Sequence, residues 1–293
     1  MEPKGALLVM YGCFTVEKPE PEGIARVLAA AFGVPLLSVD VSPESEMENR
    51  KGDASVTCDY EYLSGDLACN LSVYGAKEVV PQPSQEELTR ALASGLDTVV
   101  LTSWGTMPSI RKVVTPQGGT TFARVEFLEG EGEGCLVTAT ETALAVFPRA
   151  MVEKFPEVVR GFPVATPLAD GLLAGADRNS PAGDVRDLVW AWEALISRMA
   201  AGWPPSDWYG AAMYGEDLEN RDRLAAAVEA LPADERAQAE AVVESLDAAF
   251  REGTADDGGR ALAAALEGGS EGFASAPWYW RRRPVALPWE TEE

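Results

Sequence analysis

The sequence predicts an α+β protein in which a mostly antiparallel sheet with two helices precedes an all-helical, tryptophan-rich C-terminal region. Three observations support this class. β-rich runs outnumber helical segments early in the chain, long amphipathic stretches dominate later, and all tryptophans except Trp104 lie in the second half. We expect an α+β domain at 1–145, a proline-rich connector at 146–183 and a helical domain at 184–293, with a single continuous core as the alternative.

Short runs of β-favouring residues define the strands of the first domain. Ser64-Gly65-Asp66 and the glycine-rich stretch 129–134 lie between such runs, which is typical of hairpin turns. Hairpins thus outnumber helical crossovers, which favours an antiparallel sheet over a doubly wound parallel one. The predicted strands are 6–11, 34–41, 54–63, 67–74, 98–104, 110–115, 120–128 and 135–139.

Two helices are predicted among these strands. Residues 21–32 repeat apolar side chains at helical spacing, and Gly33 supplies a stop signal. The second helix follows Ser84, whose hydroxyl can cap it, and Glu87 stands at capping-box spacing.

One broad apolar stripe organises the C-terminal region. From Asp184, apolar residues recur at helical spacing until Gly202, and acidic residues stand in the first turn, where the helix dipole favours negative charge. Thr254 is expected to cap the last helix, and the prolines after residue 276 indicate an extended end. Further helices are predicted at 217–230, 233–251 and 254–266.

The net charge is −23, from 24 basic and 47 acidic residues, and both halves of the chain contribute. An acidic surface repels nucleic acid and anionic membranes and attracts basic proteins, although solubility alone would also explain it. No apolar run reaches the roughly 18 residues of a membrane span, and the first run is too short for a signal peptide. We therefore expect a cytoplasmic protein that binds neither nucleic acid nor membrane.

Histidine is absent, which excludes Ser-His-Asp and Cys-His catalysis and every histidine-containing zinc centre. No glycine-rich phosphate loop or dinucleotide motif occurs, so no cofactor is expected. The four cysteines form no Cys-x-x-Cys pair, which argues against a zinc site or a redox dithiol. Cys13 follows the first strand, but no basic neighbour in the sequence would lower its pKa, so we expect a buried, inert thiol.

Two segments are candidate partner-binding sites. At a predicted hairpin tip, alternating carboxylates could hold a divalent cation or contact a basic partner, with a solvated turn as the alternative. Near the C-terminus, interleaved aromatic and arginine side chains are typical of binding hot spots and can also stack nucleobases. That segment could instead dock on its own domain, with its rings buried and its arginines paired. The residues are Glu129, Glu131, Glu133, Trp278, Tyr279, Trp280, Arg281, Arg282 and Arg283.

Two further motifs have structural interpretations that compete with functional ones. Asp256-Asp257-Gly258-Gly259 could hold a metal or phosphate, but its position before an apolar run favours helix capping. The stretch 203–210 combines aromatic residues with two prolines and could form a ligand platform. A packed turn that ends the preceding helix is the interpretation we favour, because proline pre-sets turn geometry without needing a ligand.

Together these observations favour a non-catalytic acidic protein-binding factor. Its expected form is an inhibitor or immunity-type protein that neutralises a basic partner through charge and shape complementarity. A histidine-free enzyme that uses carboxylates or a cysteine for metal-assisted hydrolysis or group transfer is the second hypothesis. The third is a structural component of a larger assembly. No metal is expected under the leading hypothesis.

Overall fold

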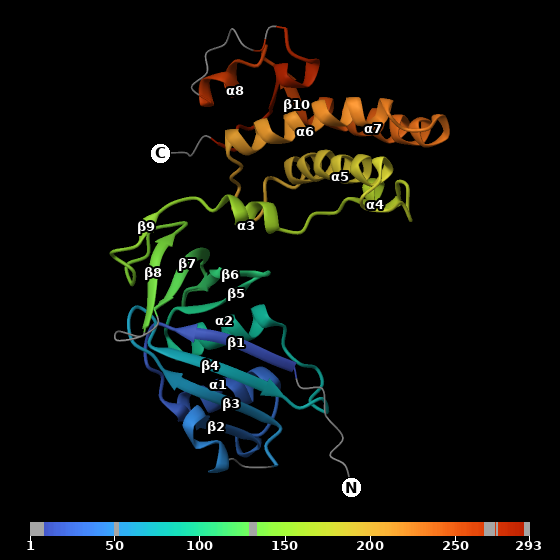
Figure 1. Ribbon diagram of the computed structural model, residues 1–293. Helices are drawn as coiled ribbons and strands as arrows, with labels where there is room; N and C mark the ends of the chain where they lie inside the picture. The colour runs from blue at the N-terminus through green and yellow to red at the C-terminus, as the bar shows by residue number, and fades with distance from the viewer. Residues whose placement is uncertain (1–8, 50–52, 129–133, 267–272, 274, 290–293) are drawn as a thin grey trace. The chain divides into compact units, whose positions relative to one another are not determined.

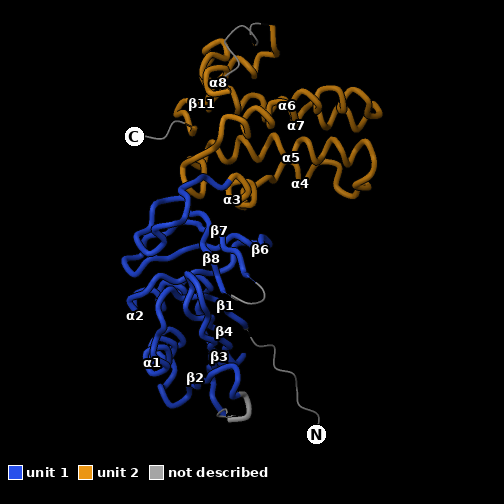
Figure 2. Tube along the Cα trace, turned by 60° about the vertical axis from the view of Figure 1, so that its left-hand side comes forward, with its two compact units in different colours: residues 1–155 blue, residues 156–293 orange. Residues whose placement is uncertain are grey.

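The computed structural model describes residues 9–49, 53–128, 134–266, 273 and 275–289. The chain forms two compact units, residues 1–155 and 156–293 (Figure 2). A large mixed sheet occupies the first unit and most helices lie in the second, so the predicted α+β class is confirmed (Figure 1). In the described part of the chain, every helix is too short or too polar to cross a membrane.

Unit 1 is built on a nine-stranded sheet with the order β2-β3-β4-β1-β5-β6-β7-β8-β9. Its pairs are antiparallel except β2–β3 and β8–β9, which are parallel. The first strand reaches Thr15, beyond its predicted end, because Tyr11, Cys13 and Thr15 alternate into the core. The strands are β1 (Val9–Thr15), β2 (Val39–Pro43), β3 (Val56–Tyr62), β4 (Cys69–Gly75), β5 (Val100–Trp104), β6 (Met107–Val114), β7 (Thr120–Leu128), β8 (Gly134–Thr140) and β9 (Met151–Val152).

The two predicted helices of this unit are confirmed as α1 (Pro21–Phe32) and α2 (Gln85–Leu96). Gly33 ends α1 in the left-handed conformation at φ 63°, which glycine adopts without strain. Ser84 and Glu87 form the expected capping box: the Ser84 N–H donates to Glu87 Oε2 at 2.7 Å, and the Glu87 N–H donates to Ser84 Oγ at 3.2 Å. Both helices bury leucines against strands β1, β3 and β4 in one core cluster.

A second core cluster in unit 1 joins β5–β8 to the loop that follows β3. In this loop, Ser64 O accepts from the Cys135 N–H at 2.9 Å and the Asp66 N–H donates to Cys135 O at 2.7 Å. Gly65 has φ 95°, and a Cβ there would lie 2.3 Å from Cys135 O, so only glycine permits this approach. Leu67 and Phe147 are buried in the cluster.

Unit 2 is mainly helical, but it also contains a two-stranded sheet that the all-helical prediction did not include. The segment 146–183, predicted as one connector, is divided between the units, and Phe147, Phe155 and Leu172 are buried in it. The elements are α3 (Pro156–Gly161), α4 (Pro167–Gly171), α5 (Pro181–Ala200), α6 (Ala211–Glu229), α7 (Ala233–Gly253), β10 (Thr254–Asp256), α8 (Arg260–Ala265), the 3-10 helix η4 (Trp278–Arg281) and β11 (Arg282–Pro284).

Helix α5 begins three residues before the predicted start at Asp184. The Ser180 hydroxyl accepts from the Gly183 N–H at 3.2 Å, and Pro181 occupies the first helical position, where proline needs no hydrogen-bond partner. Asp184 therefore lies in the first turn and does not open the helix.

The prediction for Thr254 was wrong. Thr254 begins strand β10, and its hydroxyl donates to Phe250 O at 2.6 Å, so it does not cap a helix. Asp257 accepts from the Gly259 and Ala261 N–H groups at 2.8 Å each and takes the capping role. The end of the chain is also not simply extended, because η4 precedes β11, which pairs with β10.

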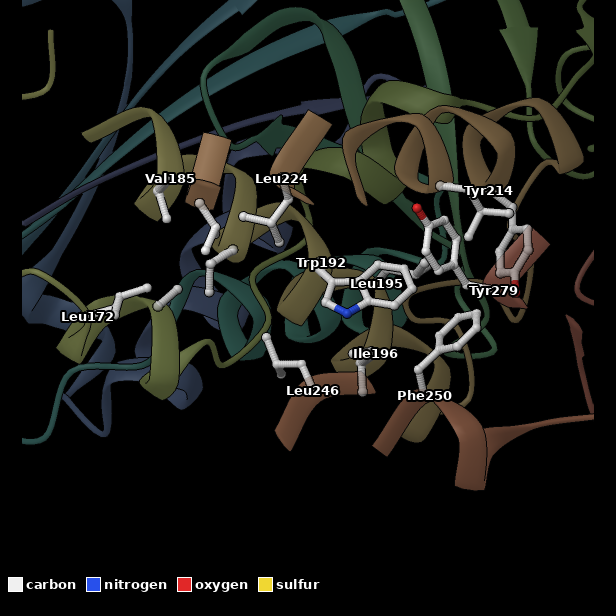
Figure 3. Close-up of a cluster of buried hydrophobic side chains, with 14 of the residues drawn as sticks. Leu172, Val185, Trp192, Leu195, Ile196, Tyr214, Leu224, Leu246, Phe250 and Tyr279 are labelled. Carbon is white, nitrogen blue, oxygen red and sulfur yellow. The ribbon is translucent and has the colours of Figure 1, made fainter. Parts of the chain in front are cut away.

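Trp192 lies at the centre of the unit 2 core and is fully buried (Figure 3). Its ring centroid lies 4.6 Å from that of Phe250 and 6.1 Å from that of Tyr279. Trp203 is also buried, at 5.0 Å from Tyr209, so the stretch 203–210 packs as a turn. The aromatic core therefore joins α5, α7, η4 and the turn after α5.

Candidate functional site

A groove of about 370 Å³ lies between α6 and α7. Its lining residues recur every three or four positions on each helix, which places them on one face of α6 and one face of α7. Residues 230–232 join the two helices, and α5 packs against both. The lining residues are Arg221, Leu224, Ala225, Val228, Glu229, Glu240, Val243, Glu244, Asp247 and Arg251.

A buried ion pair fixes the base of the groove. Arg221 donates from Nε to Asp247 Oδ1 at 3.0 Å and from Nη2 to Asp247 Oδ2 at 2.8 Å. The indole N–H of Trp192 donates to the same Oδ1 at 3.1 Å, and the ring of Tyr279 lies 5.2 Å from the Arg221 guanidinium. These contacts use both carboxylate oxygens, so Asp247 is a structural anion and not a free ligand.

Three carboxylates at the rim are exposed and unpaired. Within the described part of the chain, the side chains of Glu229, Glu240 and Glu244 form no ion pair and no hydrogen bond. Ala225, Val228 and Val243 add an apolar wall to the lining. The groove therefore combines an apolar surface for an aliphatic chain with negative charge for its cationic end.

Arg251 is the second cation among the described residues that line the groove. Its guanidinium lies 3.7 Å from the ring centroid of Trp278, a close cation–π contact. Because Asp247 neutralises Arg221, the remaining charged lining side chains are Arg251 and the three glutamates, which leaves the described lining with a net negative charge.

The predicted aromatic and arginine segment is docked within unit 2. Tyr279 is buried, its hydroxyl donates to Asp222, and the indole N–H of Trp280 donates to Asp222 Oδ2 at 3.0 Å. Trp280 also stacks on Phe273, with ring centroids 5.2 Å apart. The rings of this segment are thus engaged by the protein itself.

The three arginines of the segment differ in the groups that they contact. Arg282 donates to Thr254 Oγ1 at 2.8 Å and to the carbonyl oxygens of Thr254 and Arg251, and Arg283 donates to nearby carbonyl oxygens. Among the described residues, Arg281 alone of the three contacts a carboxylate, with 3.6 Å between Nη2 and Asp256 Oδ2. The segment therefore contacts β10 and α6 and includes part of β11. A partner-binding role for its residues stays a prediction.

The other candidate residues form no metal site in the described part of the chain. Glu129, Glu131 and Glu133 lie outside the described residues, although β7 and β8 on either side pair as the predicted hairpin. Asp256 accepts from the Gly258 N–H at 3.0 Å, a bond within the turn that precedes α8. Among the residues that can be described, no three cysteine, aspartate or glutamate side chains are grouped to hold an ion.

The four cysteines are buried and form no disulfide. Burial, with a smaller contribution from Cys69, raises the pKa of the Cys13 thiol to about 12. Burial likewise raises the pKa of Cys69 to about 11. Since the thiolate is the reactive form, Cys13 and Cys69 are inert near neutral pH, as predicted for Cys13.

Sequence inspection missed Glu229, Glu240 and Glu244. One signal was present: Glu240 and Glu244 are like charges at i and i+4, a spacing that slightly destabilises an isolated helix. Glu229 belongs to another helix, so its approach to the pair requires the tertiary fold.

No model of a known protein family, no curated protein and no solved structure matches this chain. The functional inference is therefore based on the chemistry of the groove.

Proposed function

We propose that this protein is a non-catalytic acidic binding protein that captures a basic segment of a partner protein in the α6–α7 groove. An inhibitor that neutralises a basic partner is the specific form we favour. One observation carries this proposal: three exposed, unpaired glutamates surround a groove with an apolar wall.

The groove suits lysine or arginine side chains in size and chemistry. Its volume of about 370 Å³ lies in the range of ligand-binding pockets. The methylene stem of such a side chain would pack on Ala225, Val228 and Val243, and its charged end would meet the rim glutamates. An arginine could bind one carboxylate through two parallel hydrogen bonds.

The charge of the whole chain supports the same partner class. A net charge of −23 steers a basic protein toward the surface and raises its association rate at low salt. The described lining residues offer no hydroxyl, thiol or amine nucleophile, and the buried carboxylate is held by Arg221. These features support binding over catalysis.

Affinity capture from the native cell tests this proposal. Three baits are compared: the wild type, the groove variant Glu229→Gln/Glu240→Gln/Glu244→Gln, and the control Glu78→Gln/Glu126→Gln/Glu219→Gln. The control residues are also exposed, and no ion pair engages them within the described residues, so both variants lose the same charge.

We expect wild type and control to capture one basic protein near one-to-one stoichiometry and the groove variant to lose it. Raising the salt from about 0.05 M to about 0.5 M should release the partner, because the Debye length shortens. Equal capture by all three baits would contradict the groove assignment. Capture of nothing at either salt would favour the histidine-free enzyme.

A further inference from the structure

A second groove, in unit 1, lies beside the edge of the sheet. Strand β2 is the last strand on its side, so one row of its backbone N–H and C=O groups faces no other described strand. Helix α1 packs along the same strand, and Figure 2 shows the two side by side. Between them is a groove of about 580 Å³.

The apolar side of this groove is unusually exposed. Leu36 and Leu37, in the 3-10 helix η1 (Leu36–Ser38) that leads into β2, are 51% and 87% exposed. Both line the groove together with Ala25 of α1 and with Val39 and Val41 of β2. Two adjacent leucines next to an unpaired strand edge form a surface that a pairing strand would cover.

The polar part of the groove is acidic. Glu22 and Asp40 line it, and Arg26 is the one cation among its described lining residues. The exposed Glu44 and Glu46 follow directly after β2. This charge, together with the net −23 of the chain, opposes pairing of β2 with β2 of a second copy and favours a basic occupant.

We propose that β2 binds an extended, basic segment of a partner protein as an added strand. Main-chain hydrogen bonds to β2 would provide affinity, and alternate side chains would provide specificity. Because strand side chains alternate in direction, apolar residues of the segment would face Leu36, Leu37 and α1, while basic residues between them would meet Asp40 and the glutamates. This proposal does not depend on the α6–α7 groove.

An eight-residue peptide of alternating lysine and valine tests the proposal in the full-length protein. Its control is the same peptide N-methylated at alternate residues, which removes the N–H groups of its pairing edge. We expect the unmodified peptide to bind at least tenfold more tightly and to slow hydrogen exchange of the amides of residues 39–42. Equal binding of both peptides, or unchanged exchange in β2, would overturn the proposal.

Protein variants separate this surface from the α6–α7 groove. Leu36→Gln/Leu37→Gln should weaken the peptide at least fivefold, while the matched variant Met10→Gln/Val80→Gln, at residues 66% and 82% exposed, should leave its affinity unchanged. The triple glutamine variant at residues 229, 240 and 244 should still bind. Loss of binding only in that triple variant would place the peptide in the α6–α7 groove and overturn the β2 assignment.

Discussion

At the scale of single residues, unit 2 depends on buried charges that are paired within it. Asp217 accepts hydrogen bonds from the Tyr209 hydroxyl and from Arg160 Nη1, the latter at 2.6 Å. Burial raises the pKa of Asp217 above its usual value, while the nearby Arg160 opposes that shift. Arg221 and Asp247 form a second pair beneath the α6–α7 groove. Removing one partner of such a buried ion pair strongly destabilises the folded protein, because the other charge stays buried and unpaired.

Asp247→Ala should reduce the free energy of unfolding by about 3–5 kcal/mol, because it leaves Arg221 buried without its counter-ion. Urea denaturation followed by tryptophan fluorescence measures this. Asp234→Ala, at an exposed position of the same helix, is the control and should change stability by less than about 1 kcal/mol. Equal effects of the two substitutions would show that the Arg221 pair has no special role.

The buried thiols predict a loss of stability in alkali. Their pKa values are near 9 when exposed, but about 12 for Cys13 and about 11 for Cys69 in the fold. Both thiols therefore favour the folded state below pH 9, and this contribution is lost as pH rises toward 11, since only the unfolded chain releases the protons. Each thiol contributes about −1.4 kcal/mol per pH unit in that window.

Cys13→Ala tests this directly. The slope of unfolding free energy against pH, measured between pH 9 and pH 11, should become shallower by about 1.4 kcal/mol per pH unit in the variant. The tyrosines contribute equally to both proteins and cancel in the comparison. Identical slopes would mean that Cys13 already ionises in the folded protein.

At the scale of elements, the sequence predicts most strands and helices because each follows a local rule. The helix stop at Gly33 and the capping box at Ser84 appear in the structure as expected. Several boundaries differ from the prediction, and at two of them local signals compete: Ser180-Pro181 begins α5 before its apolar stripe starts, and Thr254 pairs in a strand that depends on the distant Pro284. Because Thr254 and Pro284 lie far apart in the sequence, the spacing of nearby residues does not predict that they pair.

Removal of the residues after Ala276 tests the docking of the aromatic segment. Truncation deletes β11, the buried ring of Tyr279 and the hydrogen bonds of Arg282. Loss of one large buried aromatic alone typically costs about 3–5 kcal/mol, so the melting temperature should fall by many degrees. Circular dichroism during heating measures it, and an unchanged melting temperature would contradict the docked arrangement.

At the scale of the whole molecule, the net charge follows directly from the composition, but the position of the α6–α7 groove does not. The net charge of −23 and the absence of histidine are the sequence features on which the proposal of a non-catalytic protein with a basic partner rests. The position of the unpaired charge depends on how α6 and α7 pack on α5, which brings Glu229 near Glu240 and Glu244. Spacing within one helix could place only the last two together.

The most direct test of the α6–α7 groove is the affinity of a synthetic amphipathic helix of lysine and leucine, measured by fluorescence anisotropy at about 0.05 M salt. The wild type, the triple glutamine variant at Glu229, Glu240 and Glu244, and the triple control at Glu78, Glu126 and Glu219 are compared. We predict a loss of about tenfold or more in the groove variant, against less than about threefold in the control. Equal losses in the two variants would show that only overall charge attracts the peptide, and the groove would then not be the binding site.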